Sequence, residues 1–207
     1  MESSRFWHLS TRADRRALPL ADRHYNRQKV GSPQFVPPGR CLVLLTEDAS
    51  ALWVTTWPFA RFVKHRWAGA WVNSLFRRES GPLASDLIRD AVAVTLGRWP
   101  EPPPQGIVSF VDAGKTRRKR DVGRCYLRAG WRYAGCHRLD PSCAECQARI
   151  EKRGSAAKPC GLTQEEGLYA LQLLPADMPQ PLQYRPRLDE PGRRSQPRLG
   201  WPMYLNA

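Results

Sequence analysis

The spacing of apolar and polar residues divides the N-terminal part of the chain into short elements. Residues 5–9 alternate well enough to predict a first strand, and residues 11–27 predict a helix that is broken at Pro19. Residues 30–40 hold X-Pro steps and glycines, which exclude regular structure, so we expect a rigid loop there. The apolar runs at 41–46 and 51–57 then flank a polar turn, which predicts an antiparallel hairpin.

The middle of the chain, residues 71–135, predicts the order strand, basic loop, helix, strand, helix, strand. The first helix has one apolar stripe at helical spacing, made of Leu83, Leu87, Ile88, Ala91, Val94 and Thr95. Ser80 or Gly81 lies in its expected N-cap region, with Pro82 in the first turn. We expect the strands at 71–76, 106–112 and 132–135, and the second helix at 121–131, closed by Gly130.

The basic loop before the first of these helices has the composition of an anion site. Arg77, Arg78 and Gly81 lead directly into the helix N-terminus, where free amides and the helix dipole favour negative charge. Many helices begin in this way, so the loop by itself is a weak signal. It indicates a phosphate-bearing ligand only together with the elements that follow.

Lysine and arginine number 33 against 19 acids, which gives a formal net charge of +14. A solvated, arginine-rich surface explains such charge, and so does a polyanionic partner. The bases are clustered at 61–78, 115–128 and 185–198, which favours nucleic acid. Around Lys64 and Arg66 they alternate with aromatic residues suited to stacking on bases, although the same aromatics could simply pack on the hairpin.

Four cysteines predict a metal site late in the chain. Cys136, Cys143, Cys146 and Cys160 are spaced C-x6-C-x2-C-x13-C, and a C-x2-C pair of thiolates favours zinc in a structural role. His137 is the alternative to Cys136 as a ligand. Disulfides are disfavoured because the sequence has neither an export signal nor an apolar run of membrane-spanning length, and we expect a cytoplasmic protein.

The cysteine segment, residues 136–162, is expected to be an insertion before a final strand at 167–174. Domain 1–174 would then be followed by a tail, residues 175–207, that is rich in proline and arginine. This tail is expected to be extended, either wrapping the domain or reaching along a partner. The fold class is α/β, with a mixed central sheet flanked by helices.

The segment Cys125–Trp131, followed by Gly135, resembles the helix-strand signature of the GNAT N-acetyltransferases, and the element order over 71–135 is theirs. The family's pyrophosphate loop survives loosely, as residues 78–84. The resemblance implies an acyl donor such as acetyl-coenzyme A. It places Tyr126 as the acid that protonates the leaving thiolate, a role that suits a phenol.

Four further segments are similar to the phage Mom-type proteins, divergent relatives of these acetyltransferases: Arg23–Asn26, Gly31–Phe35, Ala70–Arg77 and Phe110–Asp112. This resemblance implies a transferase that adds a small acyl-derived group to the exocyclic amine of a base, expected to be adenine, in double-stranded phage DNA. The modification protects the DNA from restriction in the bacterial host. It also implies extrusion of the base from the duplex.

The resemblance assigns roles to individual residues. Asp112, at a strand end, is the candidate base or amine anchor, although such carboxylates often only cap a turn. Ser74 and His24 join Tyr126 and Asp112 as catalytic candidates. The donor is expected to contact Asn73, Arg77, Arg78, Ser80, Gly81 and Ser85. DNA is expected to contact Tyr25, Lys64, Arg66, Lys115, Arg117, Arg118, Lys119 and Arg120.

Two other functions are compatible with the sequence. One is an acetyl-coenzyme A-dependent N-acetyltransferase that acts on a small amine or a protein. The other is a DNA-binding protein without catalytic activity. Strong coenzyme A binding without DNA affinity would favour the first, and DNA binding without a modified nucleoside would favour the second.

Overall fold

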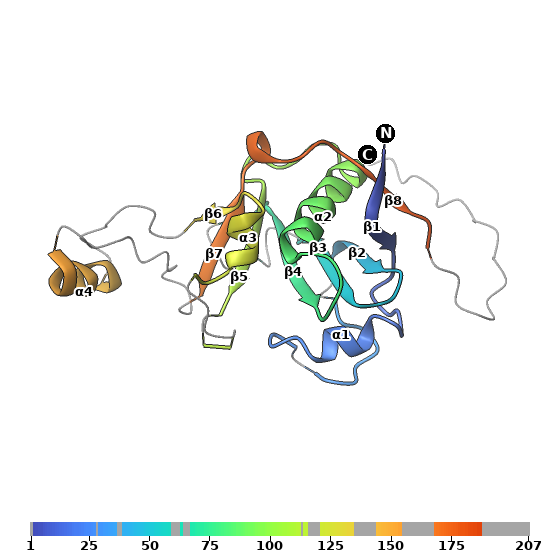
Figure 1. Cartoon of the computed structure of the whole chain (residues 1–207), viewed down its shortest axis with the longest axis horizontal. Coiled ribbons are helices and arrows are strands. Elements are labelled where there is room, and N and C mark those ends of the chain that lie inside the picture. The colour runs from blue at the N-terminus through green and yellow to red at the C-terminus, as the bar shows by residue number, and fades with distance from the viewer. Residues whose placement is uncertain are drawn as a thin grey trace, which may run out of the picture.

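The computed structural model describes residues 2–27, 29–36, 39–58, 63, 67–112, 114–115, 121–134, 144–154 and 168–187. In these residues the chain is an α/β protein with one open, mixed sheet of eight strands in the order β6-β7-β5-β4-β3-β2-β1-β8 (Figure 1). The strands are β1 (Ser3–Leu9), β2 (Arg40–Thr46), β3 (Ala51–Trp57), β4 (Trp71–Arg78), β5 (Ile107–Val111), β6 (Arg132–Tyr133), β7 (Tyr169–Leu173) and β8 (Gln183–Arg185).

One half of the sheet is antiparallel and follows the chain. β1 pairs with β2, β2 with β3 and β3 with β4, all antiparallel. The predicted hairpin is confirmed as β2–β3, with Leu45 opposite Leu52. The predicted first strand is confirmed as β1. Almost every residue of β2 and β3 is buried, because both faces of the sheet are covered.

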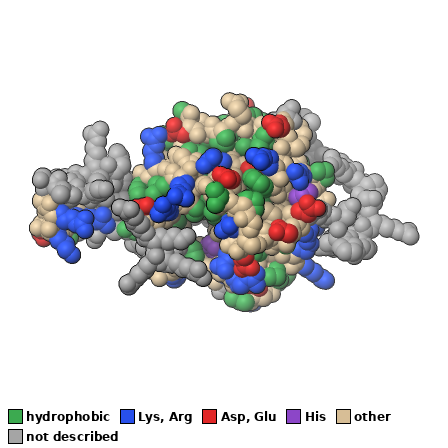
Figure 2. Space-filling view, in the orientation of Figure 1, with side chains coloured by type: hydrophobic (Ala, Val, Ile, Leu, Met, Phe, Trp, Pro, Cys, Tyr) green, Lys and Arg blue, Asp and Glu red, His purple; other side chains and the backbone are tan. Residues whose placement is uncertain are grey.

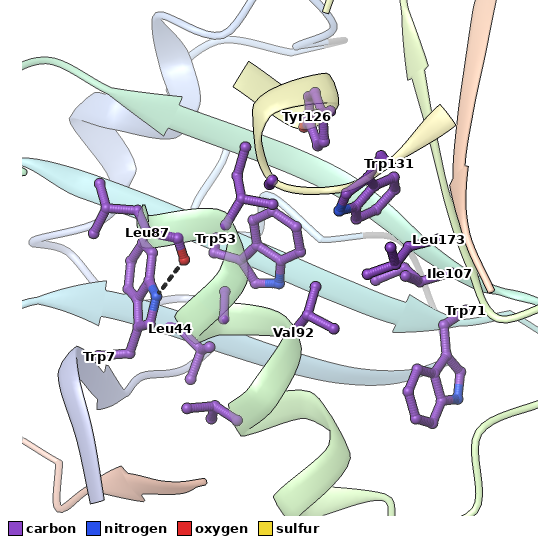
Figure 3. Close-up of a cluster of buried hydrophobic side chains, with 14 of the residues drawn as sticks. Trp7, Leu44, Trp53, Trp71, Leu87, Val92, Ile107, Tyr126, Trp131 and Leu173 are labelled. Carbon is purple, nitrogen blue, oxygen red and sulfur yellow. Dashed lines mark hydrogen bonds between the residues drawn. The ribbon is translucent and has the colours of Figure 1, made fainter. Parts of the chain in front are cut away.

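Successive residues of the central strands point to opposite faces and enter different cores. Leu44 and Trp53 belong to the core beneath α2 (Ala84–Arg98), together with Trp7 and Tyr126. Figure 3 shows this core, with the Trp7 indole donating to the Leu87 carbonyl oxygen at 2.9 Å. The other face packs residues such as Leu45 against α1 (Leu18–Asp22).

The second half of the sheet changes direction. β4 and β5 are parallel, and α2 makes the crossover between them. β7 then inserts antiparallel between β5 and β6. The predicted order of strand, loop, helix, strand, helix, strand over residues 71–135 is confirmed, with α3 (Arg124–Arg128) as the second helix.

Limits of three helices differ from the predictions, and α3 covers only residues 124–128 of the expected 121–131. Only residues 18–22 of the expected helix 11–27 are helical, and Pro19 lies in the first turn, where its missing N–H costs nothing, so it does not break the helix. α2 begins at Ala84 with Leu83 as N-cap, so Ser80, Gly81 and Pro82 precede the helix. Leu83 has non-helical backbone angles and is 64% exposed, so its place in the apolar stripe was wrong.

The chain after β7 wraps the α2 face. A 3-10 turn, η3 (Pro175–Asp177), leads to β8, which pairs in parallel with β1. Between them the Leu182 N–H donates to the Ala93 carbonyl oxygen of α2 at 2.9 Å. Of the two courses expected for the tail, residues 175–187 take the wrapping one. Residues 188–207 lie outside the described part of the chain.

The final helix, α4 (Ala144–Arg153), lies apart from the sheet in Figure 1. Of the four expected zinc ligands, only Cys146 lies in the described residues, where it is buried. Cys136, Cys143 and Cys160 lie outside them. Among the described helices, none is both long and apolar enough to span a membrane.

Candidate functional site

β4 and β5 separate at the centre of the sheet. Their parallel pairing covers Trp71 to Asn73 on β4 and ends where Asn73 faces Ser109 of β5. β4 continues to Arg78, and its register with β3 shifts between Asn73 and Leu75, which leaves Ser74 as a bulged residue. The bulge follows directly after the last β4–β5 pair. Because a bulge bends its strand and changes the direction of its side chains, it marks the point where β4 and β5 diverge.

The Asn73 side chain holds the bulge from inside. Its Nδ2 donates to the Val54 carbonyl oxygen at 3.1 Å and to that of Leu75 at 3.0 Å. Its Oδ1 accepts from Tyr126 Oη at 2.6 Å and from Ser109 Oγ at 3.2 Å. Asn73 is buried, and its hydrogen-bonding groups are all used by the protein. The structure thus gives Asn73 a positioning role, and its side chain as seen here is not presented to a donor molecule.

Tyr126 reaches the divergence point from α3. The short helix follows Gly123, whose φ of +67° is a left-handed conformation that glycine adopts without strain. Figure 3 shows the ring beside Trp131, whose centroid is 5.0 Å away. Burial raises the pKa of Tyr126 well above its usual value, so its hydroxyl stays protonated at neutral pH.

Tyr25 reaches the same gap from the α1 side of the sheet. Its hydroxyl donates to the Phe110 carbonyl oxygen at 3.2 Å, just beyond the last β4–β5 pair. Burial, in the first place, raises the pKa of Tyr25. Cys125, which precedes Tyr126, makes a smaller electrostatic contribution that raises the pKa of both phenols. Two tyrosines therefore meet between β4 and β5 from the two opposite faces of the sheet.

His24 stacks on Tyr25, with ring centroids 4.5 Å apart. Burial and the positive charge of Arg77 lower the pKa of His24 to about 4, so the imidazole is neutral at pH 7. The Asn26 backbone N–H lies 3.3 Å from Nδ1, which makes Nδ1 the acceptor and leaves the proton on Nε2. His24 is therefore a weak base in this structure and can offer a hydrogen-bond donor.

A pocket of about 240 Å³ opens beside His24 on the α1 face. Ser74 and Leu75 of β4 form one wall, and the segments around α1 form the rest. The Ser74 hydroxyl oxygen is buried and has no hydrogen-bond partner among the described residues. Because Ser74 is also the bulged residue, the pocket and the β4–β5 gap meet at one point of β4.

Asp112 follows β5 and is held by the turn after it. Its Oδ1 accepts the Gly114 N–H at 2.8 Å, and its Oδ2 lies 3.7 Å from Lys115 Nζ. The carboxylate thus caps the turn, as strand-end carboxylates often do. The same contacts place Lys115 next to Asp112. Lys115 is the one residue of the basic run 115–120 that lies in the described part of the chain.

The basic loop is tied together by its own side chains. Arg23 binds Glu79 through two bonds of 2.6 and 2.8 Å, and Arg77 lies 3.3 Å from the same carboxylate. Arg78 Nη2 donates to the Gly81 carbonyl oxygen at 2.8 Å, and no described acid pairs with Arg78. Gly81 has a φ of +81° that permits this turn. Ser80 is exposed, whereas Ser85 is buried in the first turn of α2.

Several predicted site residues lie outside the described part of the chain. These are Lys64, Arg66, Arg117, Arg118, Lys119 and Arg120, with the three cysteines named above. Within the described residues, no group of three or more His, Cys, Asp or Glu side chains is arranged to hold a metal ion. The zinc site stays a prediction.

The structure brings Tyr126, Asn73, Ser74, Tyr25 and His24 together around the β4–β5 gap and the pocket beside it. Sequence reasoning missed Ser109, which binds Asn73, and Asn26 and Gln34, which line the pocket. Ser109 lies opposite Asn73 in the register of β4 and β5, which local pattern does not reveal. Comparison of the chain with protein-family models, curated proteins and solved structures finds no match.

Proposed function

We propose that this protein is a DNA base-modifying transferase with a GNAT-like fold, which adds an acyl-derived group to the exocyclic amine of a base. The observation that carries the proposal is the divergence of β4 and β5 at a bulge, with Tyr126 and Tyr25 at the gap and a pocket beside it. The strand order, antiparallel through β4 and then parallel to β5 with β7 inserted, supports the resemblance found in the sequence.

The residues at the gap fit an acyl donor in part. Among the described residues, the buried hydroxyl of Ser74 has no partner and Arg78 has no acid to neutralise it. A thioester carbonyl and a phosphate would satisfy these two groups. Arg77, by contrast, shares the Glu79 carboxylate with Arg23. A thioester donor would supply the acyl group and leave as a thiol.

Residues of this chain would donate a proton to the leaving thiolate and accept one from the attacking amine. Tyr126 holds its proton on Oη, since burial raises the pKa of the phenol, and from there it can protonate a departing thiolate once its bond to Asn73 is released. Asn73 and Ser109 hold that hydroxyl at the divergence point. The amine of the base would lose its proton as its nitrogen forms the new bond to the acyl carbon. Asp112, which follows β5 and is paired with Lys115, is the candidate acceptor of that proton.

Positive charge supports DNA as the acceptor. The net charge is +14, and Figure 2 shows Lys and Arg side chains over the visible face and on the projecting lobe that holds α4. Phosphate contacts by such residues supply most of the affinity of nonspecific DNA binding. A free small-molecule amine would need no such surface.

One observation favours a second candidate, a DNA-binding protein without transferase activity. Tyr126 is buried, and its hydroxyl is already bonded to Asn73. A protein that lost the chemistry could keep this cluster for stability alone. The same experiment separates the two functions.

The test is mass spectrometry of nucleosides from plasmid DNA of cells that express the wild type, Tyr126→Phe or Tyr133→Phe. We expect a heavier deoxynucleoside with the wild type and its loss with Tyr126→Phe. Tyr133→Phe is the matched control, because Tyr133 Oη donates to the Val122 carbonyl oxygen at 2.8 Å, outside the gap. Unaltered nucleosides from a folded wild-type protein would reject the transferase and leave the DNA-binding candidate.

A further inference from the structure

The pocket beside Ser74 is small and is lined by both apolar and polar side chains. At about 240 Å³ it is smaller than the roughly 300–1,000 Å³ of pockets for drug-sized ligands, so its size suits a single ring system better than a whole nucleotide cofactor. Its lining residues are His24, Asn26, Arg27, Gln34, Phe35, Val36, Ser74 and Leu75. They combine flat or apolar surfaces with the ends of polar side chains.

The pocket carries no uncompensated charge from its lining residues. Arg27 Nε lies 2.8 Å from the carboxylate of Asp22, and its other nitrogens donate to the carbonyl oxygens of Ser32 and Gln34. The hydrogen bond from Arg27, in the first place, lowers the pKa of Asp22, so the pair stays ionised together. His24 is neutral at pH 7. A phosphate would therefore find no free cation here, whereas an uncharged ring would lose little on entry.

The polar groups fit a heterocycle with both donors and acceptors. Asn26 and Gln34 are exposed amides, each with a donor and an acceptor at one end, which is the pairing that recognises adenine. His24 offers Nε2–H, and the buried Ser74 hydroxyl has no partner in the part of the chain that the structure describes. Phe35 and His24 add aromatic rings to the lining, and aromatic rings are the side chains on which bases stack.

Two arginines that do not line the pocket belong to the segments that form it, close in sequence to His24 and Leu75. Arg23 and Arg77 share the single carboxylate of Glu79, so this trio has a net charge of +1. Arg77 lies close enough to His24 to lower its pKa. A neutral pocket with this positively charged trio beside it suits a base that is still attached to its phosphodiester backbone.

We propose that this pocket holds an unpaired adenine of a polynucleotide, with Asn26 and Gln34 reading its hydrogen-bonding edge and Arg23 and Arg77 binding the flanking phosphate. The inference rests on the proposed function in taking DNA as the acceptor. It adds where the base is bound and which residues select it. The base would then lie against Ser74, at the point where the pocket meets the β4–β5 gap.

The test is the affinity of the full chain for two labelled single-stranded oligothymidylates, one of which carries a single central adenine, measured by fluorescence anisotropy without an acyl donor. We expect the adenine-containing strand to bind roughly 5- to 150-fold more tightly, the range of one bidentate amide–base contact. In the double variant Asn26→Ala, Gln34→Ala the two strands should bind equally.

Gln183→Ala is the matched control, an exposed amide on β8 at the far edge of the sheet, and should keep the preference. An unchanged melting temperature excludes misfolding, and Asn26→Asp with Gln34→Glu, which keeps side-chain shape but removes the donors, should also lose the preference. Equal affinities in the wild type, or a preference that survives in both double variants, would overturn the pocket assignment. A modified nucleoside found in cells alongside equal affinities would retain the transferase and reject only the pocket. A preference for adenine without any modified nucleoside would retain the pocket assignment and reject the transferase.

Discussion

Asn73 concentrates four hydrogen bonds at one point of the sheet, and each joins a different part of the molecule. Its amide nitrogen satisfies carbonyl oxygens of β3 and β4 at the bulge, and its oxygen receives hydroxyls from β5 and α3. Buried polar groups cost free energy when they lose their partners. The cluster is therefore as much a requirement of the fold as of the site.

Replacing Asn73 by alanine should lower the free energy of unfolding by roughly 3 kcal/mol or more, because several buried groups lose their partner at once. Urea titration followed by tryptophan fluorescence measures the change. Ser109→Ala removes only one of the four bonds and should cost about 1 kcal/mol. Equal effects of the two substitutions would show that Asn73 is not the hub of the cluster.

His24 makes stability depend on pH. Its pKa is about 4 in the folded protein, below the ordinary histidine value of 6.5, so the unfolded chain binds the proton more readily. The contribution of neutral His24 is complete above pH 6.5 and is lost as the pH falls from there towards 4. The loss amounts to at most about 3 kcal/mol.

The measurement compares the free energy of unfolding of the wild type and His24→Asn between pH 7 and pH 4. An asparagine oxygen can replace Nδ1 as the acceptor for the Asn26 N–H. The difference between the two proteins should shrink or change sign as the pH falls. A pH-independent difference would contradict a neutral buried His24.

At the scale of elements, the segment after β7 closes the α2 face and adds a strand to the opposite edge. Arg132 of β6 lies 2.6 Å from Asp177 at its start, and Arg185 Nε donates to the Ser4 carbonyl oxygen at its end, at 2.9 Å. Between these ends it passes so close to α2 that a Cβ on Gly97 would lie 1.9 Å from the Leu182 carbonyl oxygen. The helix needs a glycine there because backbone packs on backbone.

Gly97→Ala should therefore lower the melting temperature, although alanine in an exposed helix interior would raise stability by about 1 kcal/mol over glycine. The clash displaces Leu182 and breaks its bond to Ala93. Scanning calorimetry measures the shift, and proteolysis between residues 175 and 187 should become faster. Arg98→Ala, at an exposed neighbouring position, is the control and should change little. A more stable Gly97→Ala protein would show that the segment does not pack closely on α2.

For the whole molecule, charge decides the range of partners. Basic residues outnumber acids by 33 to 19, and α4 ends in Lys152 and Arg153 on the lobe apart from the sheet. A duplex that contacts both the lobe with α4 and the sheet domain would release counterions at each contact. Affinity should then fall steeply with salt concentration.

The slope of log affinity against log salt concentration for duplex DNA tests this directly. Each lost phosphate contact should reduce the slope by about 0.9, so Lys152→Gln with Arg153→Gln should reduce it by up to about 1.8. Arg98→Gln should leave it unchanged. An unaltered slope in the double variant would place α4 outside the DNA interface.

The sequence by itself determined the elements whose pattern is local. The β2–β3 hairpin, β4, β5, α2 and β7 followed from alternation, helical spacing and turn residues, although β7 is not the final strand that was predicted, because β8 follows it. Tyr126 and Tyr25 were identified as site candidates. The predicted ends of α1 and the predicted start of α2 were wrong, because caps depend on backbone angles that neighbouring segments impose.

Only the tertiary structure decided which residues share a site. Asn73 and Ser109 are 36 positions apart, and they meet because two parallel strands come into register, which neither stretch of sequence encodes by itself. Likewise the proline-rich tail shows no strand pattern at 183–185, yet it forms β8 because the free edge of β1 offers unpaired backbone groups. Local pattern fixes elements through side-chain period, whereas pairing and burial between distant segments fix the site.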